Sequence, residues 1–448
     1  MSRIRRWYRD EQAFSVLLML ILLFASWVAG GASRANAPGQ LVVRVTAIGI
    51  LIILSARRRT WTIDGVKLPL AIVAGAALIA MYQLIPLPPA LWLSLPGHAP
   101  FAAAIPGNDQ PWRPLNLTPD AGWNALLSLV VPLAMVAILA VLDRGWDMVV
   151  VRTLLATVVV AALVGSLQLS GVTFDNPFIN ETVGEAAGIF ANRNHQALLL
   201  ACGLPLAGVW AFRQGRHLER ERMAVALGLT VWFLFLVLLT GSRAGLVLAT
   251  AGLLAMGLLA APRLGRLRPR WVLPALCGAV VLSVGAIVAI GLNSGKALSL
   301  QRMLASPDGR DIRSTALPLL RELVTRFFPF GSGMGSFDPM FRIVEPKALL
   351  APTYFNHAHN DALEVVIEGG LPAAALVGFV LFCWGRLSFA AWRDLREGRG
   401  VAFAGWATLS LILASSLVDY PTRTPTIMLV SVVALWLATN IGQERGRA

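Results

Sequence analysis

Apolar segments constrain the fold of this chain more than any other feature of its sequence. Nearly uncharged stretches of roughly 16 to 22 residues recur along it, each long enough as a helix to cross a hydrocarbon core of about 30 Å. Of the 448 residues, 56% are hydrophobic and 14% are charged. Because backbone polar groups in lipid must be satisfied within the protein, we expect an all-α, polytopic integral membrane protein.

The apolar runs and their polar flanks predict about twelve transmembrane helices. We expect them near residues 13–29, 40–55, 68–84, 122–142, 149–170, 195–212, 223–239, 244–261, 271–291, 369–385, 401–417 and 424–440. The chain then divides into residues 1–291 with nine helices, a long loop at residues 292–368, and residues 369–448 with three helices. The first run resembles a signal peptide, and we interpret it as an uncleaved helix.

Basic residues orient these helices. The net charge is +14, and the arginines gather between alternate apolar runs. The clusters are Arg3, Arg5, Arg6 and Arg9; Arg57, Arg58 and Arg59; Arg213, Arg216, Arg220 and Arg222; Arg263, Arg266, Arg268 and Arg270; and Arg386, Arg393, Arg396 and Arg399. The positive-inside rule places these loops and both termini on the cytoplasmic side of an inner membrane. No nucleic-acid motif accompanies the arginines, so no nucleic-acid partner is expected.

Two outer loops are long, and both are expected on the extracytoplasmic side of the membrane. Residues 85–121 are rich in proline and contain Trp92 and Trp112, which suit a membrane interface. In the second loop, residues 312–327 have apolar side chains at spacings of three and four, which predicts a short amphipathic helix. Such a helix could lie with its apolar face against the membrane surface. The glycines that follow, in FPFGSGMGSF, predict a turn rather than a nucleotide-binding loop.

The densest polar stretch is FNHAHNDALEVVIEGGLP, at residues 355–372. It contains His357 and His359, and histidine is suited to general-base chemistry near neutral pH. Asn360, Glu364 and Glu368 follow at spacings of four, which places them on one helical face below His359. Two other interpretations stay open: a solvated helix cap with incidental histidines, and a zinc site, for which no nearby third histidine or cysteine completes the ligand set.

Several arginines lie on the outer side, against the charge bias. Arg193 precedes His195 at the mouth of one helix, and Arg243 lies in a tight turn between two helices. Further outward cations are Arg310, Arg313 and Arg423. A single arginine near a helix end ordinarily extends to the interface. Several converging guanidinium groups would instead suit a pyrophosphate, because they recognise its oxygens in pairs.

Four local motifs together resemble the O-antigen ligase and polymerase superfamily of bacterial membrane glycosyltransferases. They are Asn192–His195, Gly241–Gly245, the segment 308–337, and His359-Asn360 leading to Glu368-Gly369-Gly370. The resemblance covers roughly residues 188 to 426. The ligase signature has a His-Asn pair, a glycine, and then Gly, Thr or Tyr three residues later; here the last position is Ala373, which leaves ligase and polymerase open.

The resemblance implies a periplasmic site that uses no metal or other cofactor. His359 is then the catalytic base, Arg193 and Arg243 bind the pyrophosphate, and Arg310 or Arg313 is a third ligand. The supporting residues are Asn192, His195, His357, Asn360, Glu368 and Arg423. The lack of an Asp-x-Asp pair in the outer loops agrees with metal-independent chemistry.

We therefore expect an inverting transferase whose donor is a glycan on undecaprenyl pyrophosphate. The acceptor is lipid A core in O-antigen ligation, or a second lipid-linked glycan in polymerisation, and membrane lipid surrounds the protein. A transporter or flippase is the alternative from another class. It is disfavoured because the middles of the predicted helices are nearly free of charge and no inverted repeat is evident.

Overall fold

The computed structural model describes residues 2–57, 63–105, 110–170, 176–179, 186–213, 218–264, 312–347 and 356–440. Over these ranges the protein is all-α apart from one small two-stranded sheet. The predicted helix at residues 271–291, Arg310 and the first residues of the motif at 308–337 lie outside the described ranges.

Eight helices of the described chain are long and apolar enough to cross a membrane, so the expected polytopic membrane fold is confirmed. Three shorter apolar helices accompany them. The helices at the predicted spans are α1 (Ser2–Ala29), α2 (Pro38–Ala56), α3 (Lys67–Gln83), α5 (Pro119–Ser128), α6 (Val130–Leu139), α7 (Asp147–Leu169), α8 (Arg193–Arg213), α9 (Glu219–Thr240), α10 (Arg243–Leu264), α15 (Asp361–Arg396), α16 (Val401–Ser416) and α17 (Pro425–Ala438). Because residues 271–291 are not described, the total of twelve spans stays a prediction.

The span predicted at residues 122–142 is divided into α5 and α6 at Leu129. Pro132 explains the division, because it lacks the N–H that would bond to the carbonyl of Ser128. The span predicted at 369–385 is longer at both ends and is kinked at Gly370, whose φ is 62°. The kink separates a polar first segment, residues 361–369, from the apolar remainder of α15.

The largest hydrophobic core gathers residues from α1, α2, α6, α7, α8, α10, α16 and α17. Nearly all of α8 is buried, so this helix lies inside the bundle rather than against lipid. We define the outer end of the bundle as the end where α1 finishes at Ala29 and α2 begins at Pro38. The loops that carry the predicted site lie at this end.

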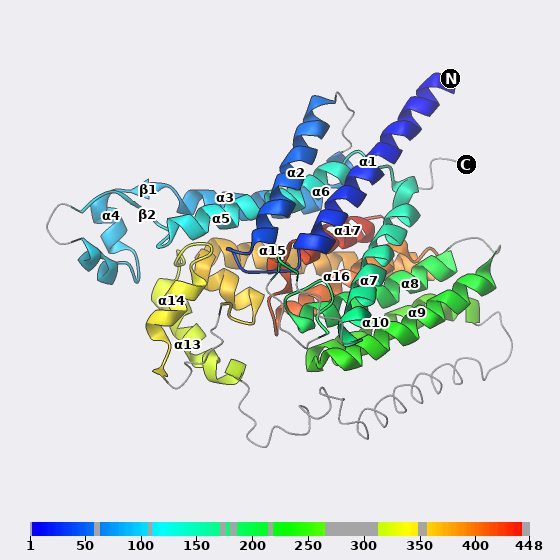
Figure 1. The fold of residues 1–448 in the computed structure, drawn as a ribbon. Coiled ribbons are helices and arrows are strands. Elements are labelled where there is room, and N and C mark those ends of the chain that lie inside the picture. The colour runs from blue at the N-terminus through cyan, green and yellow to red at the C-terminus, as the bar shows by residue number, and fades with distance from the viewer. Residues whose placement is uncertain are drawn as a thin grey trace, which may run out of the picture.

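The loop between α3 and α5 forms a small lobe that projects beyond these helices at the left of Figure 1. Strands β1 (Pro86–Leu87) and β2 (Arg113–Pro114) pair antiparallel and close it. The lobe contains α4 (Pro89–Ser94) and the short 3-10 helix η2 (Ala99–Ala104). Two other 3-10 turns, η1 (Ile63–Gly65) and η3 (Arg144–Trp146), precede α3 and α7, and a third, η5 (Pro421–Arg423), precedes α17.

The predicted amphipathic helix is confirmed as α13 (Ile312–Phe327), followed by α14 (Phe337–Val344). Its apolar side chains Ala316, Leu320 and Leu323 are buried in a second hydrophobic cluster with α14 and Ile367 of α15. The expectation that this face lies on the membrane surface is therefore wrong: the face packs against the protein, since α14 and the first segment of α15 supply an apolar partner.

Candidate active site

His359 lies in the loop just before α15, where its backbone has a φ of 49°. Such a conformation is uncommon for a non-glycine residue and marks a tightly determined position. Asn360 holds the loop on both sides, because its side chain accepts from the backbone N–H of Leu363 at 3.0 Å and donates to the carbonyl of Leu417 at 2.9 Å. The first of these bonds caps α15. Asn360 therefore supports the candidate base through the backbone.

The imidazole of His359 pairs with a carboxylate from another part of the chain. Its Nδ1 lies 3.3 Å from Oδ1 of Asp419, which follows α16 and is buried. With Nδ1–H donating to the carboxylate, Nε2 is the nitrogen that accepts a proton. About a quarter of the His359 side chain, 26%, is exposed, whereas only 2% of the Asp419 side chain is. The pair thus combines an accessible imidazole with an enclosed orienting group.

Asp419 also joins the start of α8 to the candidate base. Its Oδ2 accepts from the side-chain amides of Asn194 at 2.7 Å and Asn192 at 3.4 Å. Burial alone would raise the pKa of Asp419, but the hydrogen bond from His359 and the charges of His195 and His359 lower the pKa below its usual range. Asp419 therefore stays ionised and keeps His359 oriented.

Tyr420 packs three histidines into one cluster. Its ring centroid lies 4.3 Å from that of His357, 4.9 Å from that of His359 and 5.3 Å from that of His195. His195 is fully enclosed, and neither of its ring nitrogens has a hydrogen-bond partner. Burial raises the pKa of Tyr420, and the nearby charge of Asp419 raises it further, so the phenol stays neutral. Tyr420 and His195 accordingly support the site through packing.

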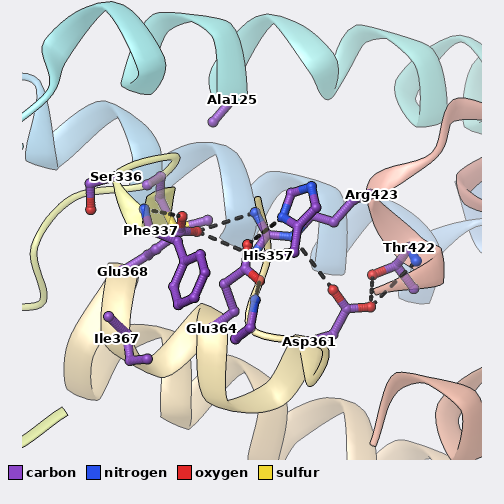
Figure 2. A network of polar contacts seen from close by, with 12 residues as sticks. Ala125, Ser336, Phe337, His357, Asp361, Glu364, Ile367, Glu368, Thr422 and Arg423 are labelled. Carbon is purple, nitrogen blue, oxygen red and sulfur yellow. Dashed lines mark hydrogen bonds and ion pairs between the residues drawn. The ribbon is translucent and has the colours of Figure 1, made fainter. Parts of the chain in front are cut away.

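Arg423 meets three carboxylates from the first segment of α15 (Figure 2). Its guanidinium lies 3.5 Å from Asp361 and 3.2 Å from both Glu364 and Glu368. Burial alone would lower the pKa of Arg423, but these three charges raise it well above its usual range. Arg423 therefore compensates an acidic cluster, and this explains how an outward arginine serves the site without facing an anionic substrate.

The face carrying Glu364 was expected below His359, but the structure pairs Glu364 with the other histidine. Oε1 of Glu364 lies 2.8 Å from Nδ1 of His357, and Oε2 accepts from the backbone N–H of Ala358 at 2.7 Å. Figure 2 shows this pair beside Arg423. The preceding loop turns back over α15, so the nearer carboxylate reaches His357, while His359 points to Asp419.

Glu368 connects the acidic cluster to the glycine turn. Its side chain accepts from the backbone N–H of Phe337 at 3.1 Å, and its backbone carbonyl accepts from Gly333 at 2.9 Å. The predicted turn is confirmed, with positive φ at Gly331, Gly333 and Gly335. A Cβ on Gly331 would lie 2.3 Å from the carbonyl oxygen of Glu368. Only glycine allows this close approach between the turn and α15.

Arg193 and Arg243 are the first residues of α8 and α10. Arg193 lies between the two asparagines that bond to Asp419, which places it beside the His359–Asp419 pair. Ser242 caps α10 by accepting from the N–H of Gly245 at 2.9 Å. A Cβ on Gly245 would lie 2.4 Å from Cβ of Ala197, so the first turns of α8 and α10 are in close contact. The N-termini of α8 and α10, each of which begins with an arginine, therefore lie side by side at the outer end of the bundle.

The other two arginines that were predicted to bind the pyrophosphate have no described side chains. Arg310 lies outside the described residues, and Arg313 lies in the first turn of α13, where only the backbone is described. In the part of the chain that is described, no cluster of three or more His, Cys, Asp or Glu side chains could hold a metal ion.

Sequence reasoning missed Asp419 and Tyr420 as site residues. The available signal was an acidic residue directly after a long apolar run, followed by an aromatic residue and proline. This pattern is common in membrane proteins, and it points to a site only when the partner histidine is known. That partner, His359, lies 60 positions away from Asp419 in the sequence.

Residues 228–383 match the family model described as O-antigen ligase. A search among curated proteins found no match. The matched range includes His359, Asn360, Glu368 and Arg243, whereas Asn192, Arg193, Asp419 and Arg423 flank it on either side. The resemblance drawn from the four motifs is confirmed, and the candidate site is completed by segments beyond the matched range.

Proposed function

We propose that the protein transfers a polysaccharide from undecaprenyl pyrophosphate to a hydroxyl group of lipid A core, because residues 228–383 match the family model described as O-antigen ligase. The family supports a ligase or polymerase type of function in O-antigen processing in a bacterial membrane. The donor, the acceptor, the inner membrane and the periplasmic location belong to the proposal. The observation that carries it is the pairing of His359 with Asp419 at the outer end of the bundle.

In the proposed reaction, Nε2 of His359 removes the proton from the acceptor hydroxyl. The hydroxyl oxygen attacks the anomeric carbon of the donor sugar, and the bond from that carbon to the pyrophosphate oxygen breaks. The pyrophosphate leaves with the bonding electron pair, and attack from the opposite face inverts the anomeric centre. General-base catalysis of this kind contributes about 10² to 10⁴ in rate.

The departing pyrophosphate requires compensation of its negative charge. Arg193 and Arg243 are proposed to provide it, together with the N-termini of α8 and α10. Guanidinium groups bind phosphate oxygens in pairs, and undecaprenyl pyrophosphate is already a good leaving group. We therefore propose metal-independent transfer, in which arginines neutralise the charge that a divalent cation neutralises in other phosphate chemistry.

A deletion strain tests the biological reaction. Loss of the polysaccharide ladder, with intact core and accumulated carrier-linked polymer, is the expected phenotype of a ligase. Polysaccharide of normal amount and length on the core would contradict the proposal. Transfer by the purified protein in the presence of EDTA tests the metal-independent mechanism separately.

Polymerisation of lipid-linked repeat units is a second candidate, favoured by Ala373 at the last position of the ligase signature. The same donor and the same base would serve this reaction, with a lipid-linked glycan as acceptor. Core that carries a single repeat unit in the deletion strain would identify a polymerase.

A further inference from the structure

Arg44 is a cation inside a membrane-spanning helix. It lies in α2 six residues after Pro38, which corresponds to about 9 Å of helix from the outer end. The surrounding span Pro38–Ala56 is strongly apolar. A charged side chain within a span is costly, and such residues ordinarily pair with an opposite charge or line a functional site.

The protein partners of Arg44 are neutral. Its Nη1 donates to Oδ1 of Asn124 at 2.7 Å, and its Nη2 lies 3.4 Å from Oε1 of Gln40. Its Nε is buried without a hydrogen-bond partner. Among the described residues, no carboxylate lies within ion-pair distance of Arg44. The charge and one donor of this guanidinium therefore remain uncompensated by the protein.

The residues beside Arg44 place apolar side chains on the surface of the bundle. Leu41 and Val45 of α2 are 67% and 59% exposed, and Trp123 and Leu127 of α5 are 56% and 49% exposed. The bond between Arg44 and Asn124 joins α2 to α5, which are neighbours in Figure 1. Exposed apolar side chains in a membrane helix contact acyl chains, and tryptophan favours the level of the lipid head groups. A lipid molecule can therefore reach the guanidinium laterally.

Arg44 is also connected to the candidate active site. Its partner Gln40 donates to the carbonyl of Ala32 at 2.7 Å, and the preceding residue, Gly31, accepts from the N–H of Ala191 at 3.1 Å. Asn192 follows directly and contacts Asp419. A lipid head group at Arg44 would thus lie at the same end of the bundle as His359.

We propose that Arg44, held by Gln40 and Asn124, binds the phosphate group of a lipid in the leaflet at the outer end. Phosphate supplies the missing negative charge and an acceptor for Nε, and arginine binds phosphate oxygens in pairs. The amide nitrogen of Asn124 adds a neutral donor. The site is separate from the proposed pyrophosphate site at α8 and α10, and its occupation requires no transfer reaction.

The test measures lipid binding to the purified full chain by native mass spectrometry. The probes are phosphatidylglycerol, bisphosphorylated lipid A, diacylglycerol and inorganic phosphate, with wild type, Arg44→Gln, Arg44→Lys and Arg342→Gln. Arg342 is an exposed arginine on α14 and serves as the control. We expect Arg44→Gln to reduce the bound fraction of at least one phosphate-bearing lipid by about tenfold, Arg44→Lys to reduce it less, and Arg342→Gln to leave it unchanged.

The probes separate the possible ligands. If Arg44→Gln loses binding of lipid A alone, the ligand is a phosphorylated glycolipid. If it loses binding of phosphatidylglycerol alone, the ligand is a glycerophospholipid. If Arg44→Gln reduces binding of diacylglycerol as much as binding of the phosphate-bearing lipids, the site recognises acyl chains rather than phosphate. This result would overturn the proposal. Displacement of the lipids by inorganic phosphate at equal concentration would overturn it as well.

A purely structural role for Arg44 makes a different prediction. If the guanidinium only joins α2 to α5, Asn124→Leu and Arg44→Gln lower the melting temperature equally, and neither changes phosphate-lipid binding. Under the proposal, Asn124→Leu retains most of the binding because Arg44 remains. Since binding is read without any transfer assay, a failed ligase assay leaves this result interpretable.

Discussion

Nδ1 of His359 lies 3.3 Å from Oδ1 of Asp419, although 60 residues separate the two in the chain. The contact joins the loop before α15 to the loop after α16. It gives the candidate base an orienting carboxylate, and the two asparagines beside Arg193 hold that carboxylate in turn. The proposed base and the proposed anion ligand are therefore positioned by one shared residue.

Replacement of His359 by alanine removes the proposed proton acceptor. We expect transfer to fall by about 10² to 10⁴, while the amount of protein in the membrane stays at the wild-type level because the side chain is partly exposed. The rate is measured with purified protein, donor and acceptor. Wild-type activity in the variant would reject His359 as the base.

Asp419→Asn retains the shape of the side chain and removes its charge. The maximal rate should fall by at least about tenfold, because the imidazole of His359 loses the charged group that orients its Nδ1–H. A maximal rate equal to that of wild type would contradict the orienting role of Asp419.

The same carboxylate affects stability in a defined pH range. Because the folded state lowers the pKa of Asp419, the stabilisation is present above the unfolded pKa of about 3.9 and is lost as the pH falls through the folded value. Between pH 5 and 8 the difference in melting temperature between wild type and Asp419→Asn should be constant. It should shrink only in strong acid.

Arg423→Met leaves three buried carboxylates without their shared cation. Removal of one partner from a buried charge network destabilises by about 3–5 kcal/mol, so we expect a large fall in melting temperature and in membrane yield. Arg423→Lys should be milder. Arg342→Met is the control: this arginine pairs with Asp338 at the surface, and such pairs contribute about 0–1 kcal/mol. Equal effects of the two methionine variants would contradict the structural role of Arg423.

Arg193→Gln and Arg243→Gln test the proposed pyrophosphate site. Each should raise KM for the lipid-linked donor and lower the rate, by about tenfold or more, because a charge-assisted contact to phosphate is lost. KM for the acceptor should change little. Arg342→Gln provides the control, and donor kinetics equal to wild type in both variants would exclude this site.

Gly331→Ala tests the close packing of the glycine turn on α15. A side chain at φ 81° is strained by about 1–2 kcal/mol, and the added Cβ would also clash with the carbonyl of Glu368. The melting temperature should fall clearly. Gly378→Ala, on the open surface of α15, has no atom near its added Cβ and should be neutral or slightly stabilising.

Local sequence patterns were sufficient to predict the membrane fold and most of its helices. Apolar runs of this length leave the chain no other way to satisfy its backbone, so the positions of α1, α2, α7, α9 and α10 could be read directly. The amphipathic spacing of α13 and the glycine turn were equally local signals. The O-antigen ligase resemblance also followed from local motifs.

The pairing of each carboxylate with its histidine depends on how the helices and loops pack together. The helical spacing predicted correctly that Glu364 and Glu368 share one face. Their partners, however, are His357 and Arg423. The loop before α15 turns back over this helix, and η5 packs against its first turns. The partner of His359 comes from the far end of α16. Periodicity describes one helix at a time, whereas a site built from several loops depends on how the helices pack, and that packing brings Asp419 to His359.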